Sequence, residues 1–139
     1  MKMIYIDGDN HIYGRLSAYV AKQLLSGEEV VIVNASKIAI TGSRKFILDK
    51  FNHRRNIGSV RKGPYYPRTP DQIMRRSIGE MLPIKKTKGL EALKRCKVYS
   101  AIPKSLKDVE FIKIDKAMNI NATGFITLGD ISKILGENQ

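Results

Sequence analysis

The fold is decided by residues 4–33, which read IYIDGDNHIYGRLSAYVAKQLLSGEEVVIV. An apolar triplet at 4–6 indicates a short strand, and apolar residues then recur every four positions, which predicts a helix over 14–26. Gly27 follows as the expected glycine at the helix C-terminus. The β-branched run at 30–33 is typical of a strand buried on both faces, as in a parallel sheet. Together these elements predict a βαβ unit with a right-handed crossover.

Helical patterns and a long loop follow this unit. A helix is expected over 43–54, where a serine can cap its first turn. Residues 52–68 have the composition of a long functional loop. A helix over 69–82 opens with threonine, proline and aspartate as N-cap, first-turn proline and first-turn acid. Gly79 inside this helix indicates close packing, and a shorter helix is expected over 89–96.

The last third of the chain completes the predicted fold. Strands are expected at 97–99 and 111–115. A final helix should begin at a capping box in 127–130 and end at Gly136, with apolar residues of its next two turns inward. We therefore expect one α/β domain spanning 1–139, with three α/β/α layers around a central, mainly parallel four-stranded sheet.

Charge is concentrated in the basic block, residues 44–107, which starts after the second predicted strand and extends past the third. The block holds 18 of the 25 Lys and Arg residues and four of the 13 Asp and Glu residues, a local excess of +14. The other 75 residues carry seven basic and nine acidic groups and sum to −2. A field concentrated in this way attracts polyanions, so the sequence predicts a nucleic-acid partner.

Irregular RNA suits this block better than a regular duplex groove does. Paired cations neutralise adjacent phosphates, and the guanidinium fork can bind two phosphate oxygens at once. Two tyrosines between prolines offer stacking surfaces, and we expect residues 52–68 to be mobile in the free protein and ordered on RNA. The predicted RNA contacts are Arg15, His53, Arg54, Arg55, Arg61, Lys62, Tyr65, Tyr66, Arg68, Arg75, Arg76, Lys85, Lys86, Lys88, Lys94 and Arg95.

Composition narrows the classes of protein that remain. Hydrophobic residues make up 42% of the chain, enough for a packed core, and no apolar run approaches the ~20 residues of a membrane span. The single Cys96 cannot form an internal disulfide, which favours a reducing intracellular compartment, and we interpret it as a small core residue. His11, His53 and Cys96 lack metal-site spacing, so neither a metal nor a cofactor is expected.

Two other functions are compatible with parts of the chain. Asp7 and Asp9 after an apolar strand resemble the carboxylate pair of haloacid-dehalogenase-like phosphatases, which hold Mg²⁺. An Asx turn explains them more simply, with His11 as a further turn residue. The second alternative is a DNA-binding module, although no helix-turn-helix or zinc pattern occurs.

Short motifs distributed over nearly the whole chain resemble the large-subunit ribosomal protein L-thirteen family. They occur in that family's order: Ile6-Asp7, Gly14-Arg15-Leu16-Ser17, Val20-Ala21-Lys22, Leu24-Leu25-x-Gly27, Val31-Ile32-Val33-Asn34-Ala35, Ile40-Thr41-Gly42, Gly63-Pro64, Arg75-Arg76, Met81-Leu82-Pro83, Lys97-Val98-Tyr99 and Ile102-Pro103. Each motif is weak alone, but the ordered set is specific. The start of the chain directly at its first strand favours the archaeal form.

This resemblance implies a structural, non-enzymatic constituent of the large ribosomal subunit that supports its assembly and translation. It also implies a parallel-sheet α/β/α fold. The expected partners are large-subunit ribosomal RNA and neighbouring large-subunit ribosomal proteins, with neither a membrane nor a small-molecule substrate. The expected location is the cytoplasm, within the large ribosomal subunit.

Overall fold

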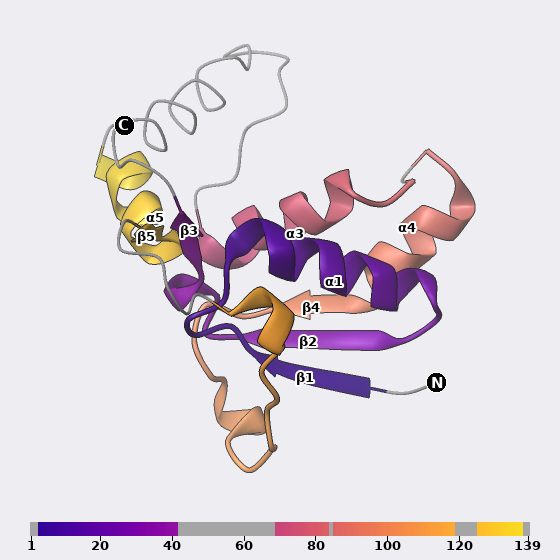
Figure 1. The fold of residues 1–139 in the computed structure, drawn as a ribbon, viewed down its shortest axis with the longest axis horizontal. Coiled ribbons are helices and arrows are strands. Elements are labelled where there is room, and N and C mark those ends of the chain that lie inside the picture. The colour runs from indigo at the N-terminus through magenta and orange to yellow at the C-terminus, as the bar shows by residue number, and fades with distance from the viewer. Residues whose placement is uncertain (1–2, 42–68, 84, 119–124, 138–139) are drawn as a thin grey trace.

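The computed structural model describes residues 3–41, 69–83, 85–118 and 125–137, which form a mixed α/β structure (Figure 1). The predicted helix over 43–54 and the loop over 52–68 lie outside these residues. The described elements are, in chain order, β1 (Met3–Asp7), α1 (Tyr13–Leu25), β2 (Glu29–Val33), η1 (Ala35–Lys37), β3 (Ala39–Thr41), α3 (Pro70–Glu80), α4 (Thr87–Lys94), β4 (Cys96–Val98), η2 (Lys104–Leu106), η3 (Asp115–Ala117), β5 (Phe125–Thr127) and α5 (Leu128–Glu137).

A parallel sheet with strand order β1-β2-β4 forms the centre of the fold. Ile4 of β1 lies opposite Val30 of β2, and Val30 lies opposite Cys96 of β4. The four residues of β2 from Val30 to Val33 are buried, as expected for a strand covered on both faces. The predicted βαβ unit, with α1 as its crossover, is confirmed.

The order of the strands determines where the crossover helices lie. From β1 to β2 and from β2 to β4 the chain steps in the same direction, so two right-handed crossovers place their helices on one face of the sheet. In agreement, α1 and α3 contact each other and lie on the same side of the strands in Figure 1. The expected third layer is therefore not confirmed over the described residues.

The prediction of a fourth strand at 111–115 is wrong. This segment runs beside β1, where the Ile112 N–H donates to the Tyr5 carbonyl at 2.9 Å and the Asp7 N–H donates to the Ile112 carbonyl at 3.1 Å. Pairing stops after the single parallel bridge between Ile6 and Ile112, and residues 115–117 turn into η3. The parallel sheet thus has three strands over the described residues instead of four.

A second, two-stranded antiparallel sheet joins β3 to β5, and the residue pattern did not predict it. Each strand has three residues, too few for a period-two pattern to show. The final helix, α5, follows β5 directly, and its predicted capping box is confirmed: the Asp130 N–H donates to Thr127 Oγ1 at 3.2 Å. Ile131 of α5 is fully buried, and the helix continues to Glu137, one residue past its predicted end.

The boundaries of α3 and α4 refine the prediction. Thr69 is the N-cap of α3 and Pro70 its first residue, as expected, although the Thr69 side chain makes no capping bond. Helix α3 ends at Glu80, two residues early, and α4 begins at Thr87, two residues early. None of the helices over the described residues combines the length and apolar character needed to cross a bilayer.

Candidate nucleic-acid interface

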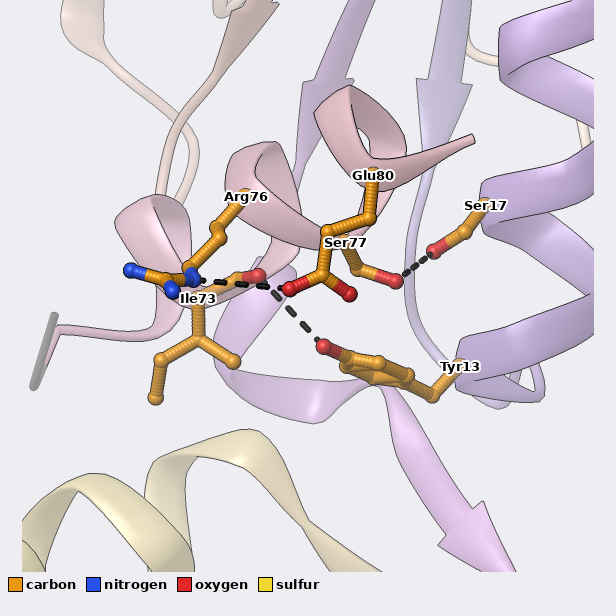
Figure 2. Close-up of polar contacts among 6 residues, drawn as sticks. All are labelled: Tyr13, Ser17, Ile73, Arg76, Ser77 and Glu80. Carbon is orange, nitrogen blue, oxygen red and sulfur yellow. Dashed lines mark hydrogen bonds and ion pairs between the residues drawn. The ribbon is translucent and has the colours of Figure 1, made fainter. Parts of the chain in front are cut away.

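The packing of α3 on α1 determines which α3 side chains reach solvent. Ile73, Met74, Ser77 and Ile78 are buried on the face that meets α1. Inside this contact, the Ser77 hydroxyl donates to Ser17 Oγ of α1 at 2.9 Å, which satisfies a polar group that would otherwise cost stability. Figure 2 shows this bond together with the one from the Tyr13 hydroxyl to the Ile73 carbonyl.

Arg75 and Arg76 occupy the opposite, exposed side of α3. Arg75 Nη2 donates to the Leu93 carbonyl of α4 at 3.3 Å, so this guanidinium lies over the junction of the two helices. Arg76 Nε lies 3.5 Å from Glu80 Oε1 one turn later, with both side chains about half exposed (Figure 2). An exposed pair of this kind holds its partners weakly, because water and salt screen it.

The lysines of the predicted site extend this exposed surface onto α4. Lys85 and Lys86 precede α4, while Lys88 lies in its first turn and Lys94 at its end. All four are exposed. Six exposed cations together form what we call the α3–α4 basic segment: Arg75, Arg76, Lys85, Lys86, Lys88 and Lys94.

Arg95 has an internal role that the sequence did not reveal. It is only partly exposed, and its Nη2 donates to the Leu24 carbonyl near the end of α1 at 2.6 Å. A cation at this position satisfies a terminal carbonyl and opposes the negative end of the helix dipole. Lys94 and Arg95 look equivalent as a basic pair in the sequence, but the structure exposes the first and ties the second to α1.

The remaining predicted contacts fall into two groups. Arg15 is exposed in the first turn of α1 and is not part of the α3–α4 basic segment. It lines a separate groove together with Lys22, Lys113 and Lys116. The other eight residues lie outside the described part of the chain and stay predictions: His53, Arg54, Arg55, Arg61, Lys62, Tyr65, Tyr66 and Arg68.

The carboxylates of the phosphatase alternative have a structural role. Asp7 Oδ1 accepts the Asp9 N–H at 3.0 Å and the Asn34 Nδ2–H at 2.9 Å. This is the Asx turn expected from the sequence, and the second bond ties it to the end of β2. Within the ranges that the structure describes, His, Cys, Asp and Glu side chains form no group of three that could hold a metal ion.

His11 is more than a turn residue. Its side chain is fully buried, and Nε2 accepts the Ile114 N–H at 2.9 Å, so the neutral ring carries its proton on Nδ1. Burial lowers the pKa of His11 below 6.5, and the Lys113 charge acts in the same direction, while Gly8, Asp9 and Asp7 oppose the shift. The ring fastens the turn after β1 to the segment that leads into η3.

Comparison with known proteins agrees with the sequence motifs. The sequence model of the family described as "Ribosomal protein L13" matches residues 1–105, about three quarters of the chain. The chain belongs to the ribosomal protein L13 family. The motif resemblance, including its archaeal type, is therefore confirmed.

Relatives named "Large ribosomal subunit protein uL13" match at nearly full length. The protein of Picrophilus torridus is 68% identical over 135 residues, which cover 97% of this chain and 98% of that protein. That of Thermoplasma volcanium is 63% identical over 134 residues, covering 96% and 98%. That of Methanocaldococcus jannaschii is 46% identical over 138 residues, covering 96% and 98%.

The one cysteine of this L13-family chain is a core residue, as predicted. Cys96 is buried at the start of β4, and burial raises the pKa of its thiol to about 12, while the Arg75 charge acts in the opposite direction. At neutral pH the thiol is protonated and therefore a poor nucleophile. In the described structure, Cys96 contributes to the packing of the core.

Proposed function

We propose that this protein is a structural constituent of the large ribosomal subunit, where it binds ribosomal RNA and supports subunit assembly and translation. It acts in the cytoplasm as a binding protein and not as an enzyme, and it needs no cofactor. The observation that carries this proposal is the family assignment over most of the chain, joined to a charge of +14 within residues 44–107. Relatives that match at nearly full length are named as large-subunit proteins.

The mechanism of binding is charge neutralisation on a folded platform. RNA helices that crowd together repel one another through their phosphates, and a protein with exposed Lys and Arg side chains lowers that repulsion. The sheet and α1 hold α3 and α4 in place, so their cations are arranged before RNA arrives. Arginine forks add bidentate bonds to phosphate oxygens.

Within this proposal the contacts differ in weight. The α3–α4 basic segment should contribute most among the described residues, because its cations are exposed. Arg95 should contribute least, because its guanidinium already binds the Leu24 carbonyl. The eight predicted RNA contacts that lie between positions 53 and 68 complete the proposed RNA interface. Neighbouring large-subunit proteins are the further proposed partners.

Sedimentation of the native protein in a cell extract tests this function. The protein should travel with large ribosomal subunits at low salt and leave them only in strong salt, because phosphate contacts release counterions. Duplex DNA at matched salt should compete poorly with folded ribosomal RNA. Migration apart from large subunits at low salt would contradict the proposal, and equal competition by DNA would favour a DNA-binding module.

A further inference from the structure

An open groove lies between α1 and η3, and none of the described residues that line it belongs to the basic block. Its volume is about 730 Å³, which falls in the range of about 300–1,000 Å³ typical of ligand pockets. Arg15 and Lys22 line it from α1, while Lys113 and Lys116 line it from the other side. Four of the seven basic residues outside block 44–107 therefore converge on one groove.

The four cations are available for a ligand. Arg15, Lys22, Lys113 and Lys116 are all exposed, and none forms an ion pair within the described structure. No acidic residue is among the described residues that line the groove. Cations that gather without internal counter-charges produce a local positive potential, which a negative ligand can neutralise.

The inner surface of the groove is apolar and firmly held. Tyr19 and Ala18 form one wall, and Ile114 and Ala117 form the other. The second wall is fixed by three hydrogen bonds: Ile114 N–H to His11 Nε2 at 2.9 Å, Ala117 N–H to the Ile114 carbonyl at 2.9 Å, and Ile12 N–H to the Ala117 carbonyl at 2.7 Å. The buried His11 ring thus positions the segment that carries Lys113 and Lys116.

We propose that this groove binds a single-stranded segment of RNA, as a second RNA surface separate from the α3–α4 basic segment. The inference rests on the proposed function, since a protein bound in the large subunit is surrounded by ribosomal RNA. An unpaired base packs against the apolar walls, with Tyr19 beside it, and the flanking phosphates contact the four cations. Duplex RNA keeps its bases stacked inside, so it cannot fill an apolar hollow in this way.

Paired charge variants separate this groove from charge in general. Lys113→Gln with Lys116→Gln removes two groove cations, while Lys104→Gln with Lys107→Gln removes two exposed lysines at the same spacing beside η2. Both variants lose the same net charge. For a short unstructured RNA oligonucleotide, the groove variant should bind about tenfold more weakly, with a salt slope shallower by about 1.4, whereas the control should stay close to wild type.

An abasic oligonucleotide of the same length tests the contact with the base. It should bind the wild-type protein several-fold more weakly than the intact oligonucleotide and lose little further affinity in the groove variant. Equal binding of the two oligonucleotides, or equal loss in both lysine variants, would overturn the proposal. Competition by polyglutamate as strong as that by the oligonucleotide would overturn it in favour of an acidic protein segment.

Binding of whole large-subunit RNA distinguishes failure of the groove from failure of the function. If wild type binds this RNA and the groove variant behaves as the control does, only the groove inference fails. If wild type itself does not bind, the proposed function fails. Thermal unfolding followed by circular dichroism should give equal midpoints for the two lysine variants, which shows that affinity changes are not caused by unfolding.

Discussion

His11 connects stability to pH, because its buried ring accepts the Ile114 N–H only when Nε2 is unprotonated. The folded-state pKa lies below 6.5, so the unfolded chain takes up a proton first as pH falls. The contribution of His11 to stability is therefore complete above about pH 6.5 and declines as pH falls below this value. Denaturant unfolding between about pH 5 and pH 8 should show this loss.

His11→Gln should remove most of that pH dependence while lowering stability at every pH. Glutamine would bond the Ile114 N–H imperfectly and would fit the buried site differently. The free energy of unfolding should therefore fall by about 1–3 kcal/mol. His53→Gln is the matched control, since these are the two histidines of the chain, and it should unfold with the wild-type pH profile. An unchanged pH profile in His11→Gln would show that another group is responsible.

We expect Glu80 to weaken the proposed binding of RNA to the α3–α4 basic segment, because its carboxylate lies beside Arg76. Glu80→Gln keeps the shape, removes one negative charge and leaves Arg76 to phosphate. RNA affinity should rise about two- to fivefold at low salt, and stability should change by less than about 1 kcal/mol. Glu91→Gln, an exposed acid on α4, is a control of equal charge. Weaker RNA binding by Glu80→Gln would contradict this role.

At the scale of single residues, side-chain type was predictable and environment was not. The pattern of the sequence marked Lys94 and Arg95 as one basic pair, yet Lys94 is exposed and Arg95 donates to the carbonyl of Leu24, 71 positions away. His11 likewise depends on Ile114, 103 positions away. Contacts over such separations leave no periodic signal in a single chain. The Asp7 turn needed only its neighbours, and it was predicted.

Gly79 of α3 and Gly129 of α5 should respond oppositely to a methyl group. A Cβ at Gly79 would lie 3.4 Å from Leu93 Cδ2, an ordinary contact, so Gly79→Ala should stabilise the protein by about 0.5–1 kcal/mol through helix propensity. A Cβ at Gly129 would lie 3.0 Å from the Ser36 carbonyl oxygen, so Gly129→Ala should destabilise it by about 1–3 kcal/mol.

Chemical denaturation of both variants against wild type measures the difference. Destabilisation by Gly79→Ala would show that the α3–α4 contact is tighter than these distances indicate. The prediction that Gly79 is closely packed is confirmed, because the Leu93 side chain lies next to its Cα. The space there is nevertheless sufficient for one methyl group.

Among the elements, those with strong local patterns were predictable. The βαβ unit has a continuous strand, a regular helix and a terminal glycine, and Gly27 has the expected positive φ of 94°. The three-residue strands β3 and β5 have no such pattern and depend on pairing with each other. The 111–115 segment has strand-like residues, but it turns into η3 after one bridge. In α4, the apolar Leu90 is 49% exposed, while the smaller Ala92 is buried.

For the whole molecule, charge counted along the chain and charge arranged in space differ. The residues outside block 44–107 sum to −2, which predicts no second binding surface. Folding nevertheless gathers Arg15, Lys22, Lys113 and Lys116 around one groove, while acids such as Asp108 and Glu110 lie elsewhere along the same segment. Counting residues could locate the basic block, because its charges are neighbours in sequence. It could not locate the four cations of the groove, which only the fold brings together.

We expect the exposed cations of the α3–α4 basic segment to hold ribosomal RNA, and the salt dependence of binding measures their contribution. The test variant changes four contacts together: Arg75→Glu, Arg76→Glu, Lys85→Glu and Lys86→Glu. Its control changes four exposed lysines outside both surfaces and carries the same net charge: Lys37→Glu, Lys104→Glu, Lys107→Glu and Lys133→Glu.

Affinity for large-subunit RNA is measured across a salt series for wild type and both variants. We expect the test variant to lose at least about a hundredfold in affinity at low salt. Its salt slope should be shallower by about 3, since each lost phosphate contact removes about 0.7–0.9. The control should keep nearly the wild-type slope. Equal slopes in the test variant and its control would show that the α3–α4 basic segment does not hold the RNA.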